Sequence, residues 1–138
     1  EGIDLLRRVL ARRAPDGDPE RLLGDQTDRV IRASGGLFRD LFRLVSALLL
    51  KGGGLPVSAA EIDGVERRQR SHIAAGLSEE QWEILATVRN TQQLRVPREH
   101  LAEARVLQAL GYVLCYRTGE IDWFDAHPLL DPLLTRSD

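Results

Sequence analysis

Few polar side chains in this sequence have the spacing that a catalytic site requires. The three histidines, His72, His100 and His127, lie on separate predicted elements, and none has a second ligand at helical spacing, so a metal site has little support. The single cysteine, Cys115, lies in a predicted strand, where the role of a small buried apolar side chain is favoured over that of a nucleophile. We therefore expect no catalytic residue and no metal site in this chain.

The local motifs of covalent and phosphate chemistry are missing as well. No serine stands in a strand-to-helix nucleophile elbow. The glycine run at 52–54 follows the only lysine, Lys51, whereas a phosphate-binding loop has its glycines before the lysine. The chain by itself is therefore not expected to be an enzyme.

One run is a candidate anion site. Gly35 and Gly36 come directly before a strongly apolar helical segment, and Arg39 lies in the first turn of that segment. An arginine beside a helix N-terminus, next to glycines that let another backbone come close, binds phosphate well. The alternative is structural: the glycines end the preceding helix, and Arg39 pairs with Asp40 or Asp28 in solvent.

Four helices in the first half of the chain would position this run. Apolar residues recur at helical spacing over 2–13, in a second segment that ends near Ala33, and over 37–50. A capping signal at Ser58 and Glu61 then opens a fourth, mostly polar helix. The segment 37–50 has the widest apolar face, so we expect it to be the most buried. We place a domain boundary near Ala75, which gives domains 1–75 and 76–138.

The second half predicts helices followed by a β-hairpin. Ser78 and Gln81 open one helix, and another runs from 97 to 110. Aromatic and β-branched residues then form two short runs, 112–116 and 121–124, on either side of a turn.

A short terminal helical turn over 127–134 closes this half, with His127 in a capping or packing role. Helices followed by a two-stranded ribbon is the order of a winged-helix domain. The predicted fold class is thus mainly α: a four-helix bundle followed by a small winged-helix domain with a β-hairpin.

Composition narrows the class of protein. The 138 residues are 43% hydrophobic and 29% charged with a net charge of −2, which suits one or two small soluble domains. No apolar run approaches the length of about 20 residues that spans a bilayer, and a single cysteine points to a reducing, cytoplasmic location. The absence of methionine leads us to expect a piece of a longer protein.

The run Ser34-Gly35-Gly36-Leu37-Phe38-Arg39, within the segment 2–70, resembles the helical lid subdomain of AAA+ ATPases, especially initiator-like and STAND-related bacterial members. The resemblance implies that Arg39 is the second sensor, which contacts the γ-phosphate of ATP, and that Ser34, Gly35 and Gly36 form the turn before it. Proline often precedes this arginine in the family, whereas Phe38 precedes it here. ATP and Mg²⁺ would be bound only in the full-length parent, whose core domain would supply the phosphate loop and the magnesium-binding acids.

The segment 77–134 is similar to the small winged-helix-like domain that follows the lid in these ATPases. The matching run is Gly111 to Glu120, followed by Trp123 and by His127-Pro128-Leu129-Leu130. The resemblance implies a regulatory C-terminal part of an ATPase that relays the nucleotide state. Its partners would be the upstream ATPase core, and neighbouring subunits or another protein.

Charge argues against DNA as the main partner of the second domain. Residues 1–75 hold thirteen basic and eleven acidic side chains, whereas residues 76–138 hold six basic and ten acidic. The arginines that could touch DNA phosphates are Arg98, Arg105 and Arg117, and neighbouring glutamates largely cancel them. We therefore favour protein contacts. A DNA-binding winged-helix module and a nucleotide-independent helical adaptor stay as alternatives.

Overall fold

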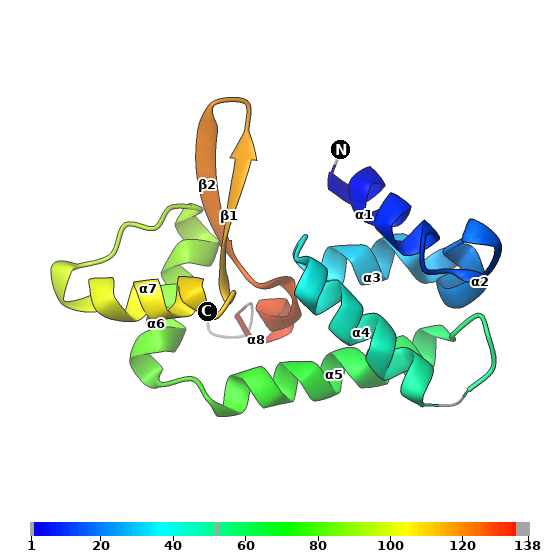
Figure 1. Cartoon of the computed structure of the whole chain (residues 1–138). Helices are drawn as coiled ribbons and strands as arrows, with labels where there is room; N and C mark the ends of the chain where they lie inside the picture. The colour runs from blue at the N-terminus through cyan, green and yellow to red at the C-terminus, as the bar shows by residue number, and fades with distance from the viewer. Residues whose placement is uncertain (1, 52, 135–138) are drawn as a thin grey trace. The chain divides into compact units, whose positions relative to one another are not determined.

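The structure is a computed structural model that describes residues 2–51 and 53–134. These residues are mainly helical and contain one two-stranded antiparallel sheet (Figure 1). The chain divides into two compact units between Ser71 and His72, a few residues before the boundary expected near Ala75. We call residues up to Ser71 the helical unit, and those from His72 onward the hairpin unit.

The helical unit consists of short helices joined by tight turns. In chain order its elements are α1 (Gly2–Ala11), η1 (Pro15–Gly17), α2 (Glu20–Leu23), η2 (Gly24–Gln26), α3 (Thr27–Ala33), α4 (Phe38–Leu50) and α5 (Ala59–Ala75), of which the last contains the division between the units. Ser58 caps α5 as expected, because its Oγ accepts a hydrogen bond from the Glu61 amide at 3.2 Å.

The second predicted helix is broken in two, so the prediction of one continuous helix up to Ala33 is wrong. Gly24 is the C-cap residue of α2 and the first residue of η2, and its φ of 56° and ψ of −139° are a backbone conformation that glycine adopts far more readily than other residues. A Cβ at this position would lie 3.3 Å from the Pro56 side chain. The Val57 amide donates to the Leu22 carbonyl at 2.9 Å. The loop before α5 therefore packs against the break between α2 and α3. The spacing of apolar residues within α2 and α3 cannot predict this contact, because the loop lies far along the chain.

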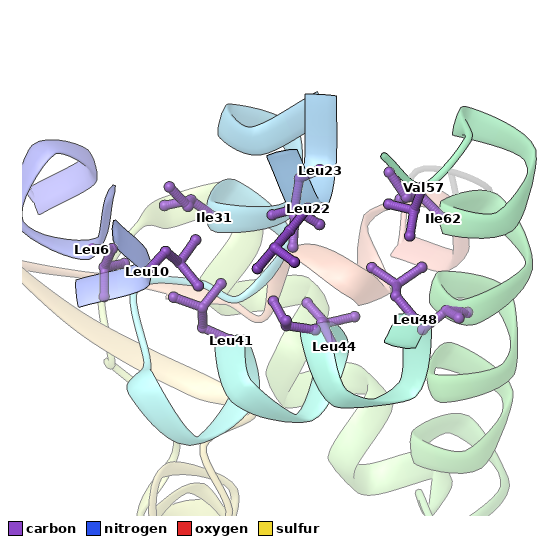
Figure 2. Packing of buried hydrophobic residues seen from close by; sticks show 13 residues of the cluster. Leu6, Leu10, Leu22, Leu23, Ile31, Leu41, Leu44, Leu48, Val57 and Ile62 are labelled. Carbon is purple, nitrogen blue, oxygen red and sulfur yellow. The ribbon is translucent and has the colours of Figure 1, made fainter. Parts of the chain in front are cut away.

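All the main helices of the helical unit contribute to one core (Figure 2). α4 contributes more buried side chains to it than any other helix within the described residues, which confirms the expectation from its wide apolar face: Leu41, Leu44, Val45 and Leu48. Leu41 has no exposed surface. Each fully buried leucine stabilises the fold by about 1.5–3 kcal/mol, so α4 is firmly held along one side.

The hairpin unit begins at the end of α5 and continues through helices into the sheet. Its elements are α6 (Glu79–Thr91), η3 (Arg98–His100), α7 (Leu101–Ala109), β1 (Val113–Thr118), β2 (Ile121–Ala126), η4 (Pro128–Leu130) and α8 (Asp131–Leu134). The capping signal before α6 is confirmed in full: the Gln81 amide donates to Ser78 Oγ at 3.1 Å, and the Ser78 amide donates to Gln81 Oε1 at 3.0 Å.

The predicted hairpin is present, and its register runs from Val113 opposite Ala126 to Thr118 opposite Ile121. Val113 and Ala126, at the end of the hairpin nearest the helices, belong to the core of the hairpin unit, and Phe124 packs against that core. Cys115 lies further along β1 and is exposed, so the expectation that it is buried is wrong. Cys115 lies in a strand as predicted, but the elements packed on the sheet leave its side chain accessible to solvent.

His127 has the capping role that was expected of it. The residue is 1% exposed, and its Nδ1 accepts a hydrogen bond from the Leu129 amide at 3.2 Å, at the start of η4. In addition, the backbone amide of His127 donates a hydrogen bond to the backbone carbonyl of Tyr112 at 2.9 Å. The second of these bonds joins the residue after β2 to the residue before β1. Among the described residues, no helix combines the length and the apolar character needed to cross a bilayer.

Candidate functional site

The turn between α3 and α4 is built by Ser34 and the two glycines that follow it. Ser34 is fully buried, and its Oγ donates to the Ile31 carbonyl at 2.5 Å and accepts from the Gly36 amide at 3.3 Å. Gly35 and Gly36 have φ of 67° and 87°, in the left-handed region where a side chain would be strained. Because its hydroxyl is used inside the turn, Ser34 shapes the turn rather than facing an incoming ligand.

The two sides of α4 differ sharply in exposure at its first turns. Leu41 points into the core, whereas the side chain of Arg39 is 60% exposed and Phe38 is 48% exposed. Leu37 precedes the helix in an extended conformation and provides no side-chain cap. The buried side of α4 thus anchors the helix, and the turn presents Arg39 on its outer side beside the positive end of the helix dipole.

Arg39 shares a carboxylate with a second arginine. Asp40 Oδ1 lies 3.5 Å from Arg39 Nε and 3.8 Å from Arg43 Nη1, and the side chain of Asp40 is only 12% exposed. Arg43, one turn after Arg39, is itself 60% exposed. The expected alternative pairing with Asp28 does not occur, since Asp28 forms an ion pair with Arg7. Two guanidinium groups therefore border one mostly buried carboxylate.

Sequence reasoning missed Arg43, and it also missed Arg13. The guanidinium carbon of Arg13, just after α1, lies 5.6 Å from the centroid of the Phe42 ring, within the range of a cation–π contact. The spacing of Arg39 and Arg43, four residues apart on a helix, was a signal that could have placed both on one face. The position of Arg13 depends on how α1 packs and had no local signal.

The arginines singled out in the second half lie in two different places. Arg117 is on the hairpin, where its Nε lies 2.7 Å from Asp122 Oδ1 on the opposite strand. The expectation that Glu120 offsets Arg117 is therefore corrected, because the strand register makes Asp122 the partner. Arg98 and Arg105 lie on η3 and α7, and neither forms an ion pair within residues 2–51 and 53–134.

The glutamates near α7 have different surroundings. Glu103 accepts a hydrogen bond from Gln81 Nε2 at 3.1 Å and so faces α6. Glu80 lies 2.6 Å from His100 Nδ1. Glu80, and to a smaller extent Glu99, raises the pKa of His100 above its usual value. Glu103 and Glu80 are thus engaged with neighbouring side chains, whereas Glu99 is exposed directly beside Arg98.

A further polar cluster, which the sequence did not reveal, holds three elements of the hairpin unit together. Arg89 Nε lies 2.8 Å from Asp125 Oδ1 in an ionic contact without the alignment of a hydrogen bond, and Arg89 Nη2 donates to Asp131. Burial acts to lower the pKa of Arg89, but the two carboxylates outweigh it and raise that pKa. The cluster borders a hollow of about 590 Å³ that is mostly apolar and includes Trp82 and Leu133 in its lining.

Within the described residues, no group of three His, Cys, Asp or Glu side chains comes together as metal ligands would. Comparisons with protein families, with curated proteins and with solved structures gave no match to this chain. The function of this chain is therefore inferred from its own residues.

Proposed function

We propose that this chain is the nucleotide-sensing lid and winged-helix part of an AAA+ ATPase. In this proposal, the helical unit closes on ATP that is held, with Mg²⁺, by a preceding core domain. Arg39 contacts the γ-phosphate and couples hydrolysis to movement of the lid. The hairpin unit then passes the nucleotide state to another protein or to a neighbouring subunit.

The observation that carries the proposal is the exposed guanidinium of Arg39 at the start of an anchored helix. The side chain is 60% exposed, whereas Leu41, two residues later, has no exposed surface. Gly36, immediately before the N-cap residue, is exposed and has a positive φ. A ligand phosphate can therefore approach Arg39 from solvent without moving any part of the core, and the helix dipole adds to the attraction.

Protein contact by the hairpin unit is favoured over DNA contact by its charges. Residues 76–138 carry ten acidic and six basic side chains, and the hairpin arginine, Arg117, is already paired with Asp122. DNA binding depends on several phosphate contacts because counterion release supplies much of the affinity. A titration with duplex DNA at low salt tests this, and binding there would favour the DNA-binding alternative.

The test of nucleotide sensing is Arg39→Ala in the full-length protein that contains this chain, with ATP turnover as the readout. A charge-assisted hydrogen bond contributes about 1.5–3 kcal/mol, so losing it should slow turnover about 10- to 150-fold. Arg39→Lys should recover only part of the rate, because lysine keeps the charge but loses the forked geometry.

The matched control is Arg68→Ala, which removes an exposed arginine of α5. Both substitutions should leave the free energy of unfolding of the 138-residue chain within about 0.5 kcal/mol, because each changes an exposed side chain. Turnover that is the same in Arg39→Ala, Arg68→Ala and the parent would overturn the proposal and would favour the nucleotide-independent adaptor.

A further inference from the structure

Asp40 is a mostly buried carboxylate that lies between two exposed arginines. Its side chain is 12% exposed, whereas those of Arg39 and Arg43 are each 60% exposed. The same oxygen, Asp40 Oδ1, lies 3.5 Å from Arg39 Nε and 3.8 Å from Arg43 Nη1. One negative charge that is largely shielded from water therefore has two cations within reach.

Both of these contacts are long. Charge-assisted hydrogen bonds between a cationic nitrogen and a carboxylate oxygen are about 2.7–2.9 Å long, and the two distances at Asp40 exceed that range. The pair of Arg21 and Asp16 in the same unit shows the contrast, since Arg21 Nη1 lies 2.6 Å from Asp16 Oδ2. The contacts of Asp40 with Arg39 and Arg43 are therefore ionic contacts, of which one can lengthen while the other shortens.

A mostly buried carboxylate opposes the binding of an anion by the arginine beside it. If a phosphate draws Arg39 away from Asp40, the charge of Asp40 stays behind in a site with little water, and an uncompensated buried charge is far more costly than an exposed one. The carboxylate also repels the incoming phosphate, because both groups are negative. A second cation next to Asp40 would reduce both penalties.

Arg43 is in the position that this second cation requires. It lies in α4 one turn after Arg39 and three residues after Asp40, a spacing at which side chains of a helix meet. Leu41 and Leu44 anchor this part of α4 in the core, so Arg43 stays near Asp40 when Arg39 moves. An approach of about 1 Å would bring Arg43 Nη1, now 3.8 Å away, into hydrogen-bond range of Asp40 Oδ1.

Arg43 is not engaged by a different carboxylate. In the part of the chain that the structure describes, its ion pair is with Asp40 alone. Several other acidic side chains of the helical unit form ion pairs with different arginines: Glu20 and Asp28 with Arg7, Asp16 with Arg21, and Asp63 and Glu66 with Arg29. The charge of Arg43 is therefore available to Asp40.

We propose that Arg43 is a positioning residue for phosphate binding by Arg39: when a phosphate group binds Arg39, Asp40 exchanges Arg39 for Arg43 as its main counterion. The ligand is the terminal phosphate of a polyphosphate chain. It meets the guanidinium of Arg39, and Arg43 acts on the binding through Asp40. This inference deepens the proposed function, because it rests on Arg39 as the residue that contacts phosphate.

The first measurement is the binding of inorganic triphosphate to the 138-residue chain. A constant ionic strength of about 0.15 M largely screens charges that lie more than about 8 Å from the ligand. Amide resonances of residues 36–40 report the binding, and we expect a dissociation constant of about 1–10 mM. Arg39→Ala should abolish the saturable shifts of these resonances. Arg43→Ala should weaken binding about tenfold, because Asp40 then competes with the phosphate for Arg39.

The second measurement repeats the titration with Asp40→Asn, which removes the carboxylate but keeps a polar side chain of the same shape. Asp40→Asn alone should strengthen triphosphate binding about threefold or more, because the competing anion is gone. When Arg43→Ala is added to Asp40→Asn, it should weaken binding by less than about threefold. A direct contact between Arg43 and the phosphate would instead give the same loss with and without Asp40.

Two further variants separate the charge of Arg43 from its effect on local structure. Arg43→Lys keeps a cation beside Asp40 and should bind triphosphate within about threefold of the parent chain. Arg12→Ala is the matched control, since Arg12 is exposed in the same unit, directly after α1, and forms no ion pair with the described residues. It should leave the affinity within about twofold.

Several results would overturn the exchange of counterions. Equal losses for Arg43→Ala with and without Asp40 would do so, and would identify Arg43 as a phosphate ligand. No saturable shifts in the parent chain, shifts that persist in Arg39→Ala, or a loss in Arg12→Ala as large as that in Arg43→Ala would overturn it as well. ATP turnover in the full-length protein tests the proposed function separately. A failed exchange therefore leaves the role of Arg39 in turnover standing, and normal turnover in Arg39→Ala refutes that role whatever the triphosphate titrations show.

Discussion

Arg89 allows the clearest quantitative test of how the hairpin is held on its helices. Its guanidinium joins α6 to Asp125 of β2 and to Asp131 of α8. Replacing it in Arg89→Leu keeps an apolar stem but leaves two carboxylates without their shared cation. We expect this single change to destabilise the hairpin unit more than any exposed arginine substitution, because the side chain of Arg89 is only 25% exposed.

The size of the effect follows from the exposure of the three groups. Breaking a fully buried pair costs about 3–5 kcal/mol, because a charge stays buried and uncompensated. Asp125 is 23% exposed and retains part of that penalty, whereas Asp131 is 47% exposed and can be hydrated again. Arg89→Leu should therefore lower the free energy of unfolding by about 2 kcal/mol, which is less than the cost of breaking a fully buried pair.

Urea unfolding followed by tryptophan fluorescence is the appropriate assay. Both tryptophans, Trp82 and Trp123, belong to the hairpin unit, so the signal reports that unit without interference from the helical unit. With a urea dependence of about 2 kcal/mol per molar, the midpoint should fall by about 1 M. The double variant Arg89→Leu with Asp125→Asn should lose less free energy of unfolding than the sum of the two single variants, because Asp125→Asn removes the carboxylate that Arg89→Leu leaves without a cation.

Arg95→Leu is the control for this experiment, since Arg95 is exposed and forms no ion pair with the described residues. It should shift the free energy of unfolding by no more than about 0.5 kcal/mol. If Arg89→Leu falls in the same range as Arg95→Leu, then Arg89 does not hold the hairpin, and the reasoning from burial and ion pairing is refuted.

Two further predictions concern pH. Glu80 raises the pKa of His100 above its unfolded value of 6.5. The pair should therefore stabilise the folded chain fully below pH 6.5, and this stabilisation should be lost as the pH rises through the folded pKa of His100. In unfolding curves measured across neutral pH, Glu80→Gln should remove this pH dependence. Burial, and then the charge of Asp125, raises the pKa of Tyr116 from 10.0 to about 12, so stability should fall between those two values as the unfolded chain ionises first. An alkaline absorbance titration should lose its late step in Tyr116→Phe, and an unchanged curve would contradict the prediction.

Local signals explain why many elements could be predicted from the sequence. The Ser78 and Gln81 signal needs only residues within one turn, and both of its hydrogen bonds are present. The apolar positions of α4 repeat at helical spacing, and Leu41 and Leu44 are buried as that spacing predicts. Gly119, with φ 62°, allows the tight turn between the two strands.

The features that the sequence did not predict share one physical cause: each depends on residues that are distant along the chain. The break at Gly24 coincides with the approach of Pro56, and no periodicity within the α2–α3 segment reports that contact. The exposure of Cys115 depends on which part of the sheet the helices cover. For the candidate site, the sequence indicated Arg39, but the arrangement of Asp40 between Arg39 and Arg43 required the structure.

By itself, the sequence determined most of the elements and their order, the caps at Ser58 and Ser78, and the position of Arg39 at the start of a buried helix, because these depend on side-chain spacing and on hydrogen bonds within one or two turns. Only the tertiary structure decided which charges are paired: Arg117 and Arg89 form ion pairs, whereas Arg98 and Arg105 form none with the described residues. An ion pair forms when folding brings two groups within a few ångströms, and the linear order of charges does not encode that distance.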